Sequence, residues 1–286
     1  QFRHTCAIAL SPFGVVHHGV RHDGLGIIQN RESRIAKHLV HAVRQESGFA
    51  LRGIKVDAVV VFGGDGTILR AADLAKGTSA PIIGINLGKV GFLAEINKPS
   101  ISELLKAIVE KKIVAEPRLT LEYKVIRDGK EIEKGWALNE IVIERSETSM
   151  LELFVQIDNR PLSRWGCDAV ICATPTGSTA YAFSAGGPVV WPEVDAMVLL
   201  PLAAHALFSD PMVVSPESNV IIDIESTQAE ISADGIRKFN LREHDRVVIT
   251  KNSWKANLSH IDDSVFTDRL VAKFKLPIEG WRGERA

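Results

Sequence analysis

The stretch that decides the fold is VDAVVVFGGDGTILRAADLAK, residues 56–76. Its apolar part, residues 56–62, predicts a buried strand, and helical spacing follows from about residue 68 to 76. Between the two, three glycines surround one aspartate, Asp65. A strand that enters a glycine turn and then a helix places free backbone N–H groups and the positive helix end at one spot. The pattern therefore predicts an α/β unit with a ligand-binding turn.

The three glycines and the aspartate of this turn indicate different tasks. Gly63, Gly64 and Gly66 let a phosphate or sugar approach the backbone, because no Cβ lies in the way. The turn has neither the spacing of a P-loop nor that of the GxGxxG fingerprint. A carboxylate repels phosphate, so Asp65 is explained only if it accepts a proton from a hydroxyl or holds a magnesium ion. The alternative is an ordinary turn in which Asp65 caps the helix.

The rest of the first hundred residues alternates between strand and helix patterns. Strands are expected at 5–10 and 81–86, and helices at 31–46 and about 100–111. This rhythm predicts a parallel α/β layer. A second glycine cluster, GINLGKVGFLAE at 84–95, follows the strand at 81–86 and is expected to line the same crevice as the first.

The chain becomes β-like after residue 117. LTLEYKVIRDGKEI has Asp128-Gly129 between two alternating runs, which predicts a hairpin, and short strand patterns continue to about residue 251. The tail FTDRLVAKFKLPIEGWRG has helical spacing. We therefore expect a Rossmann-like α/β domain over residues 1–116 and a β-rich, β-sandwich-like domain over 117–255. The segment 256–286 is expected to pack back on the α/β domain.

Two polar segments lie within the β-rich part. Asn139-Glu140 interrupts an apolar strand pattern, and an amide beside a carboxylate suits ribose hydroxyls. TPTGSTAYAFSAGGPVV at 174–190 places hydroxyls around Gly177 and one aromatic ring, Tyr181. A nucleotide base could stack on that ring while the hydroxyls bond its polar edges. The alternatives are an exposed strand end for the first segment and a polar surface loop for the second.

Composition excludes several other classes of function. The chain has 286 residues, 45% of them hydrophobic and 24% charged, as is typical of a globular protein. A formal net charge of −1 gives no footprint for nucleic acid, and the longest apolar run, at 196–208, is too short to span a membrane. With no leader pattern and three cysteines that lack zinc spacing, we expect a cytoplasmic protein.

Two rival chemistries have weaker support. Ser178, His205 and Asp234 have the residue types of a hydrolase triad, but no G-x-S-x-G elbow is present. The histidines at 17, 18 and 22 have no partner carboxylate at metal spacing, so we expect no metal site built from the protein alone.

In combination, GGDGT at 63–67, NE at 139–140 and TPTGSTAY at 174–181 resemble the NAD kinases. NLGKVGFLAE at 86–95 and the closing KFKLPIEGWRG are similar to the bacterial branch of that family. GGDGT alone is shared with diacylglycerol kinases, whereas its combination with TPTGSTAY is highly specific. The resemblance extends from about residue 56 to the end of the chain.

The resemblance implies a two-domain, magnesium-dependent kinase with its active site in the cleft between the domains. It would transfer the γ-phosphoryl group of ATP, or of polyphosphate, to the 2′-hydroxyl of the adenosine ribose of NAD. Asp65 would be the base that takes the hydroxyl proton. Homodimers or homotetramers are implied. The residues that the resemblance assigns to nucleotide binding are Gly63, Gly64, Gly66, Thr67, Arg70, Asn139, Glu140, Asp168, Thr176, Ser178, Thr179, Ala180, Tyr181 and Ser184.

The chain departs from the family pattern at three positions. Ala169 stands where glycine is usual, Asp210 where a basic residue often precedes proline, and Ile236 where a polar side chain is common. None of these changes removes a residue assigned to chemistry. A GGDGT-type lipid kinase and a non-catalytic NAD(H)-binding sensor are the alternatives. The first has no need of NE and TPTGSTAY, and the second has no need of Asp65.

Overall fold

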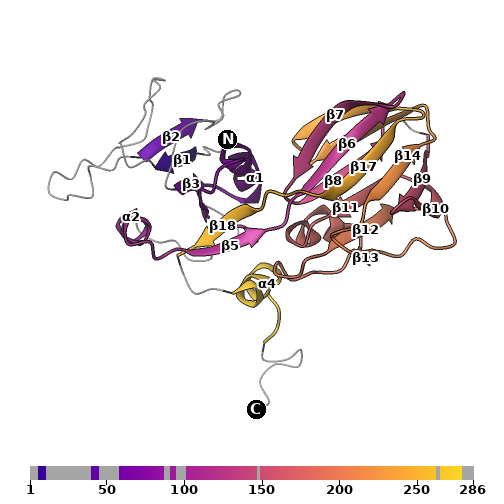
Figure 1. Ribbon diagram of the computed structural model, residues 1–286. Helices are drawn as coiled ribbons and strands as arrows, with labels where there is room; N and C mark the ends of the chain where they lie inside the picture. Colours follow the sequence, from indigo (N-terminus) through magenta and orange to yellow (C-terminus); the bar gives the residue numbers. More distant parts are fainter. Residues whose placement is uncertain are drawn as a thin grey trace, which may run out of the picture. The chain divides into compact units, whose positions relative to one another are not determined.

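The computed structural model describes residues 6–10, 40–44, 58–86, 91–94, 101–146, 149–261 and 265–278. The chain divides into two compact units (Figure 1). Unit 1 comprises Gln1–Pro117 and Ala256–Ala286, and unit 2 comprises Arg118–Lys255. The later segment of unit 1 thus returns to it after the chain has passed through unit 2.

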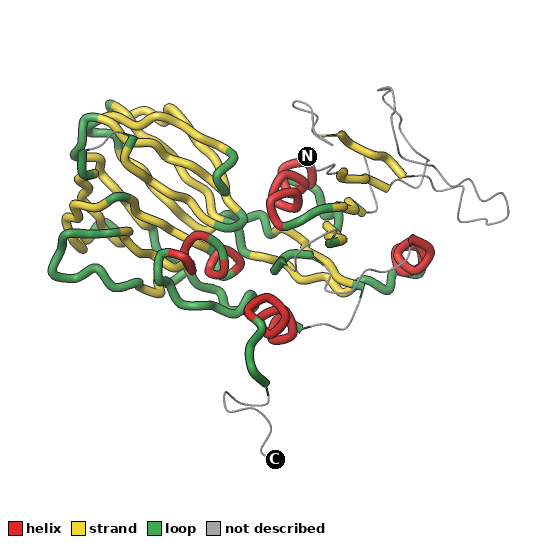
Figure 2. The backbone as a smooth tube through the Cα atoms, turned by 180° about the vertical axis from the view of Figure 1, so that it is seen from behind, coloured by secondary structure: helices red, strands yellow, loops and turns green. Residues whose placement is uncertain are grey.

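Unit 1 contains a six-stranded sheet with the order β2-β1-β3-β4-β18-β5. Its strands are β1 Cys6–Leu10, β2 Val40–Arg44, β3 Ala58–Phe62, β4 Ile82–Ile85, β5 Val114–Arg118 and β18 Ala256–His260. Its helices, red in Figure 2, are α1 Asp65–Ala75, α2 Ile101–Val109 and α4 Phe266–Phe274. Strands β3, β4 and β18 are parallel, while β1 is antiparallel to both of its neighbours. The sheet is therefore mixed: the predicted parallel pairing is confirmed for β3 and β4, whereas the pairs that β1 makes are antiparallel.

The structure corrects the sequence analysis at three further places in unit 1. Strand β2 occupies positions where helical spacing predicted a helix, and the residues before it in that prediction lie outside the described part. A short apolar run with valines fits either period, and pairing with β1 selects the strand. Helix α1 begins at Asp65, three residues earlier than expected, and strand β18 was not predicted. The strands at β1, β3 and β4 and the helices at α2 and α4 are confirmed.

Unit 2 is built from two antiparallel six-stranded sheets (Figure 1). The first sheet has the order β10 Arg160–Cys167, β9 Leu151–Ile157, β14 Val220–Ile224, β17 Arg246–Lys251, β6 Leu121–Arg127 and β7 Lys130–Ala137. The second has the order β13 Met212–Val214, β12 Met197–Leu202, β11 Ala169–Ala173, β8 Glu140–Arg145, β15 Gln228–Ala233 and β16 Arg237–Arg242. The predicted hairpin joins β6 to β7, and Asp128 and Gly129 both have positive φ, as a two-residue hairpin turn requires.

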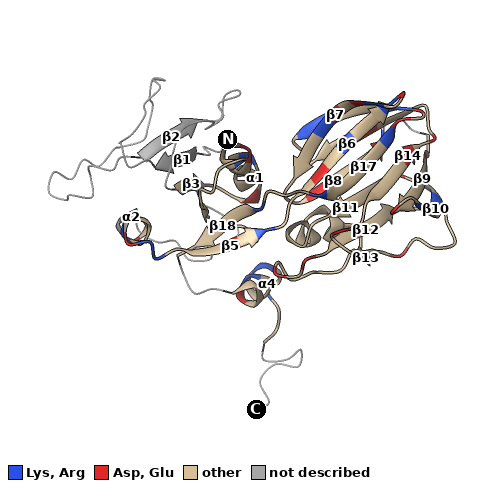
Figure 3. Ribbon diagram, in the orientation of Figure 1, with Lys and Arg blue, Asp and Glu red and all other residues tan. Residues whose placement is uncertain are grey.

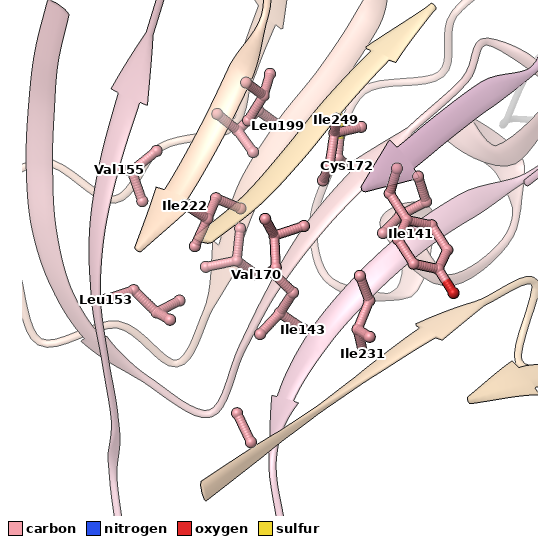
Figure 4. Close-up of a cluster of buried hydrophobic side chains, with 14 of the residues drawn as sticks. Ile141, Ile143, Leu153, Val155, Val170, Cys172, Leu199, Ile222, Ile231 and Ile249 are labelled. Atoms are coloured by element: carbon pink, nitrogen blue, oxygen red, sulfur yellow. The ribbon is translucent and has the colours of Figure 1, made fainter. Parts of the chain in front are cut away.

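One hydrophobic core joins the two sheets of unit 2. Val155 and Ile222 of the first sheet pack in the same cluster as Ile143, Val170 and Leu199 of the second (Figure 4). Burial of these aliphatic side chains is the main driving force for this part of the fold.

Strand β11 is buried on both faces, which determines where the next segment lies. Val170 and Cys172 enter the core between the sheets, whereas Ile171 and Ala173 pack in a second cluster with Ala182. Ala182 belongs to the short helix α3 Tyr181–Ser184, which follows the 3-10 turn η2 Thr176–Thr179. The hydroxyl-rich segment is therefore folded back onto the outer face of the second sheet.

Charged residues of both signs occur along the described strands of unit 2. Figure 3 shows lysine and arginine interspersed with aspartate and glutamate over the strands of unit 2. No helix among the described residues is long and apolar enough to cross a bilayer. Cys167 and Cys172 are free and buried, and burial raises the pKa of each thiol to about 12, so both are neutral at pH 7.

Candidate active site

The glycine turn of unit 1 joins β3 directly to α1. Gly64 is the N-cap residue of α1, and the N–H groups of Thr67 and Ile68 donate to its carbonyl oxygen. Helix geometry leaves the N–H groups of Asp65 and Gly66, which precede these two, without an acceptor within the helix, so they are available to an anion. A Cβ built on Gly64 or Gly66 would meet nothing within 4 Å, so the backbone is open on that side. This is the arrangement that a phosphate-binding turn needs.

The carboxylate of Asp65 is hydrogen-bonded to the loop at 91–94, which is distant in sequence. Its Oδ2 accepts the N–H of Phe92 at 3.0 Å, and its Oδ1 accepts the N–H of Leu93 at 3.1 Å. The alternative in which Asp65 serves as an ordinary helix cap is therefore not supported. Each carboxylate oxygen has two lone pairs, so each retains one for a further donor. The half-buried carboxylate is thus held in one orientation and can still accept a proton.

The second glycine cluster is brought to the same place, as predicted. A Cβ on Gly91 would lie 2.7 Å from Cγ of Asp65, so only glycine permits this approach of the loop. Gly88 lies outside the described residues. Thr67 is half-buried and Arg70 is exposed, and both lie on α1 after the turn.

In unit 2, strand pairing brings the two polar segments together. Glu140 begins β8 and is paired with Ala173, the last residue of β11. The N–H of Thr174 donates to the carbonyl of Asn139 at 2.8 Å, and its hydroxyl donates to the carbonyl of Leu138 at 2.6 Å. The segment that follows Thr174 therefore starts beside the NE pair, although it lies more than thirty positions further along the chain.

Several hydroxyls of this segment are used inside the protein. Ser178 is fully buried, and its hydroxyl bonds the carbonyl of Pro175 at 2.6 Å and the N–H of Val190 at 2.9 Å. The hydroxyl of Thr179 donates to the carbonyl of Thr176 at 3.2 Å. The alternative of an ordinary polar surface loop is disfavoured, because these bonds fix the turn in the interior of unit 2.

Tyr181 and Asp168 are linked by electrostatics across the face of the second sheet. Partial burial, and then the charges of Glu144, Asp168 and Glu140, raise the pKa of the Tyr181 phenol. Asp168 immediately precedes β11, opposite the end that leads to Thr174, and pairs with Arg145 at 3.1 Å. The pKa of the Tyr181 phenol is therefore raised by carboxylates at both ends of the β8–β11 pair: Glu144 and Asp168 at one end, and Glu140 at the other. Ala180 and Ser184 bracket Tyr181 in the same short segment.

A carboxylate that sequence analysis did not assign to the site holds the NE pair in place. Asp234 has positive φ in the turn between β15 and β16. Its carboxylate accepts the backbone N–H groups of Leu138 at 3.0 Å and Asn139 at 2.7 Å, with a longer bond from Glu140 at 3.4 Å. Arg237 donates to the same group at 2.6 Å. The only signal for it in the sequence was the ADG turn, which identifies no partner.

Glu140 and Asn139 present buried acceptors that have no donor. Among the described residues, neither Oε2 of Glu140 nor Oδ1 of Asn139 has a hydrogen-bond partner, and both side chains are more than nine-tenths buried. Burial, and then the charge of Asp234, raise the pKa of Glu140 to about 8, against the opposing effect of the Tyr181 N–H. Buried polar atoms are normally bonded, so two such oxygens on adjacent residues indicate a site for a ligand with hydroxyl or amino donors.

The rival hydrolase triad receives no support. The carboxylate of Asp234 is bonded to Arg237 and to backbone amides, and the hydroxyl of Ser178 to Pro175 and Val190, so neither is arranged around His205 as in a triad. The histidines at 17, 18 and 22 lie outside the described residues. Within the described residues, no group of three histidine, cysteine or acidic side chains could hold a metal ion.

Two of the three departures from the family pattern lie beside these contacts: Ala169 follows Asp168, and Ile236 lies in the turn of Asp234. Ala169 is buried on β11, and Asp210 is exposed. Ile236 closes the turn after Asp234 by donating its N–H to Ala233.

Comparison with known proteins gives matches to both parts of the chain. Residues 25–113 match the ATP-NAD kinase N-terminal domain, and residues 138–261 match the ATP-NAD kinase C-terminal domain. An NAD kinase of Corynebacterium diphtheriae is 50% identical over 234 residues, which are 80% of this chain and 74% of that protein. An NAD kinase of Corynebacterium glutamicum is 44% identical over 269 residues, 90% of each chain.

Solved structures show the same likeness. An NAD kinase from Archaeoglobus fulgidus in complex with ATP has a TM-score of 0.61 and 31% identity, covering 77% of this chain and 83% of that one. Yeast NADH kinase complexed with NADH has a TM-score of 0.73 at 24% identity, covering 79% and 68%. The second likeness concerns the fold alone.

Proposed function

This chain belongs to the NAD kinase family, phosphotransferases that make NADP from NAD, and we propose that Asp65 is the base of that reaction. The reaction transfers the γ-phosphoryl group of ATP to the 2′-hydroxyl of the adenosine ribose of NAD. The lipid-kinase and sensor alternatives are not favoured, because the family match includes the half of the chain that carries NE and TPTGSTAY.

The observation that carries the proposal is the fixed carboxylate of Asp65. Two backbone N–H groups hold it in one orientation, and one lone pair on each oxygen remains. A ribose hydroxyl is a weak nucleophile near neutral pH, so a positioned carboxylate that accepts its proton contributes about 10²–10⁴-fold. The open backbone at Gly64 and Gly66 and the first turn of α1 would receive phosphate oxygens. Gly63, Thr67 and Arg70 would complete this phosphate-binding part.

In unit 2, the NE pair and the segment 174–184 would bind the dinucleotide. The unpartnered oxygens of Asn139 and Glu140 would accept from ribose hydroxyls or the adenine amino group. Tyr181, 37% exposed, offers a ring face to a base. Ser178 would act indirectly, by holding the turn, because its hydroxyl is already bonded. The rest of this surface would be formed by the backbone and side chains of Asp168, Thr176, Thr179, Ala180 and Ser184.

A divalent cation, Mg²⁺, is implied by the chemistry, since it compensates the charge of the transferring phosphoryl group when bound. The described residues contain no set of three ligands for it. Mg²⁺ commonly binds through substrate phosphates and water with one or two carboxylates. The ion would therefore enter with ATP, and no residue of this chain is assigned to it.

We further propose a Rossmann-like classification for unit 1, a β-sandwich-like one for unit 2, and a homodimer or homotetramer. Polyphosphate as an alternative donor is tested by replacing ATP in the assay below.

The experiment that tests the proposal measures NADP formation from NAD, ATP and Mg²⁺. Asp65→Asn preserves shape and removes the base, and we expect kcat to fall by about 10²-fold or more. Asp73→Asn, which removes a carboxylate from the same helix α1, is the matched control and should stay within about twofold of wild type. Equal kcat in Asp65→Asn and wild type would exclude Asp65 as the base.

A further inference from the structure

Phe92 contacts both helix α4 and Asp65. Its ring packs against those of Phe266 and Phe274, with centroids 6.0 and 5.7 Å away. Its carbonyl oxygen accepts from a terminal nitrogen of Arg269 at 3.3 Å, and its N–H donates to Asp65 at 3.0 Å. The loop that orients Asp65 is thus attached to a helix 177 residues further along the chain.

One peptide group connects Arg269 to Asp65. The carbonyl of Phe92 and the N–H of Leu93 belong to the same planar peptide unit. Arg269 donates to that carbonyl, and the N–H of that unit donates to Oδ1 of Asp65 at 3.1 Å. Hydrogen bonds in such a chain polarise one another, so a cation on the carbonyl strengthens the N–H as a donor to the carboxylate.

Packing alone does not explain Arg269. Its side chain is completely buried, and its guanidinium lies 3.9 Å from a carboxylate oxygen of Glu116. Among the described residues, two of its nitrogens, Nε and one terminal nitrogen, have no hydrogen-bond partner. An aliphatic residue at this position would attach the helix without the desolvation cost of a guanidinium. The guanidinium makes a hydrogen bond to the Phe92 carbonyl beside this longer ion pair with Glu116.

We infer that Arg269 is a positioning residue for Asp65, acting through the peptide group between Phe92 and Leu93. The inference rests on the proposed role of Asp65 as the base. Loss of the guanidinium frees the loop at 91–93 and lets the carboxylate change its orientation. Because misplacement of a reacting group by about 1 Å can cost about 10²-fold in rate, the effect falls on kcat, while KM for NAD is retained.

The test compares Arg269→Met, which keeps the length of the side chain, with Leu270→Ala on the same helix. Leu270 is buried and apolar, so its truncation loosens α4 without removing the bond to Phe92. Amide hydrogen exchange of Phe92 and Leu93 is measured first, relative to the amides of β3 and β4. We expect these two amides to exchange at least about tenfold faster in Arg269→Met, and in Leu270→Ala to change no more than the rest of unit 1.

Kinetics supply the second readout. In Arg269→Met we expect kcat to fall about tenfold or more with KM for NAD within about twofold, and Arg269→Lys to recover part of it. In an Asp65→Asn background, Arg269→Met should cause little further loss, because the two residues act as one unit. Should Arg269→Met fail to fold, Arg269→Lys is measured in the same two ways.

The exchange result separates this inference from the proposed function, since it needs no turnover. Wild-type exchange at Phe92 and Leu93 in Arg269→Met overturns the inference whatever the role of Asp65. If only Arg269→Lys folds, faster exchange at these amides with unchanged kcat overturns it. A fully additive loss in the double variant also overturns it. Faster exchange in Arg269→Met together with an active Asp65→Asn enzyme would support the contact between Arg269 and the loop at 91–93, and would exclude Asp65 as the base.

Discussion

Gly177 packs directly on the backbone of Asn139, so that a Cβ on Gly177 would lie 2.7 Å from the Cα of Asn139 and closer still to its carbonyl. The contact is between two backbone segments, neither of which can move as a side chain can. Glycine is therefore required in TPTGSTAY for packing against the NE pair. Its φ is not in the left-handed region, so flexibility is not the reason.

Gly177→Ala should separate the two binding segments of unit 2. The added methyl group must displace either η2 or the backbone at Asn139, and we expect the free energy of unfolding to fall by about 1–3 kcal/mol, as for other overpacked sites. KM for NAD should rise while the Asp65 loop in unit 1 is unaffected. Urea unfolding and initial rates check this, and a variant with the stability and KM of wild type would contradict the packing argument.

Glu140→Gln should stabilise the unliganded protein increasingly as the pH rises. The pKa of Glu140 is raised from 4.5 in the unfolded chain to about 8 in the fold, mainly by burial and secondarily by Asp234. Between these values the folded state binds more protons than the unfolded state, so stability from this group is fully present below pH 4.5 and is lost as the pH rises toward 8. Glutamine is neutral throughout and avoids that loss.

Thermal unfolding of Glu140→Gln and wild type from pH 5 to pH 8.5 measures this difference. At pH 7 and above we expect the variant to be more stable by more than about 1 kcal/mol, with a smaller difference at pH 5. Glu193→Gln, an exposed position in the same unit, controls for the removal of one carboxylate. A difference that does not change with pH would show that Glu140 is ionised in the fold.

Arg237→Met should destabilise unit 2 more than a similar change on the surface. Arg237 donates to the fully buried carboxylate of Asp234 and to the carbonyl of Trp136, and its guanidinium lies 4.4 Å from the centre of the Trp136 ring. Removing it leaves a buried carboxylate whose pKa is already raised by burial. We expect a loss of about 2–4 kcal/mol.

Arg164→Met is a closely matched control for that prediction. Arg164 also lies 4.4 Å from a ring, that of Phe154, and also bonds a carboxylate, that of Glu225. Its side chain is 67% exposed, against 20% for Arg237, so the pair is screened by water. We expect a loss below about 1 kcal/mol by urea unfolding. Equal losses of stability in the two variants would show that burial of the Arg237–Asp234 pair does not increase its contribution to stability.

The parts of the fold that were predicted correctly are determined by residues that are close together in the sequence. Asp128-Gly129 requires positive φ at two successive positions, and that requirement is visible in the sequence. The strand, glycine turn and helix around Asp65 are equally local. Strand β2 was predicted wrongly as part of a helix, because VHAVR has no period long enough to exclude either structure.

The contacts that orient the site could not be predicted, because they join residues far apart in the chain. Asp65 bonds amides 27 and 28 positions away, and Asp234 bonds amides 94 to 96 positions away. A carboxylate in a turn has several possible donors, and only the tertiary fold selects among them. The structure adds contacts that the sequence did not predict: Asp234 bonds the backbone of Leu138 and Asn139, and the hydroxyl of Ser178 is bonded inside the protein.

Binding of NAD should release a proton from Glu140. In the unliganded protein a pKa of about 8 keeps most of this carboxyl group protonated at pH 7. Ribose hydroxyls or the adenine amino group would donate to Oε2 of Glu140 and Oδ1 of Asn139, which lack donors among the described residues. Hydrogen-bond donors favour the carboxylate form of Glu140, so its pKa should fall when NAD binds. Part of its proton should then be released at pH 7. Calorimetric titration with NAD in buffers of different ionisation enthalpy measures the proton released, which we expect to fall to zero in Glu140→Gln. An observed enthalpy that is independent of the buffer in the wild type would mean that Glu140 keeps its proton and acts as a donor to the nucleotide.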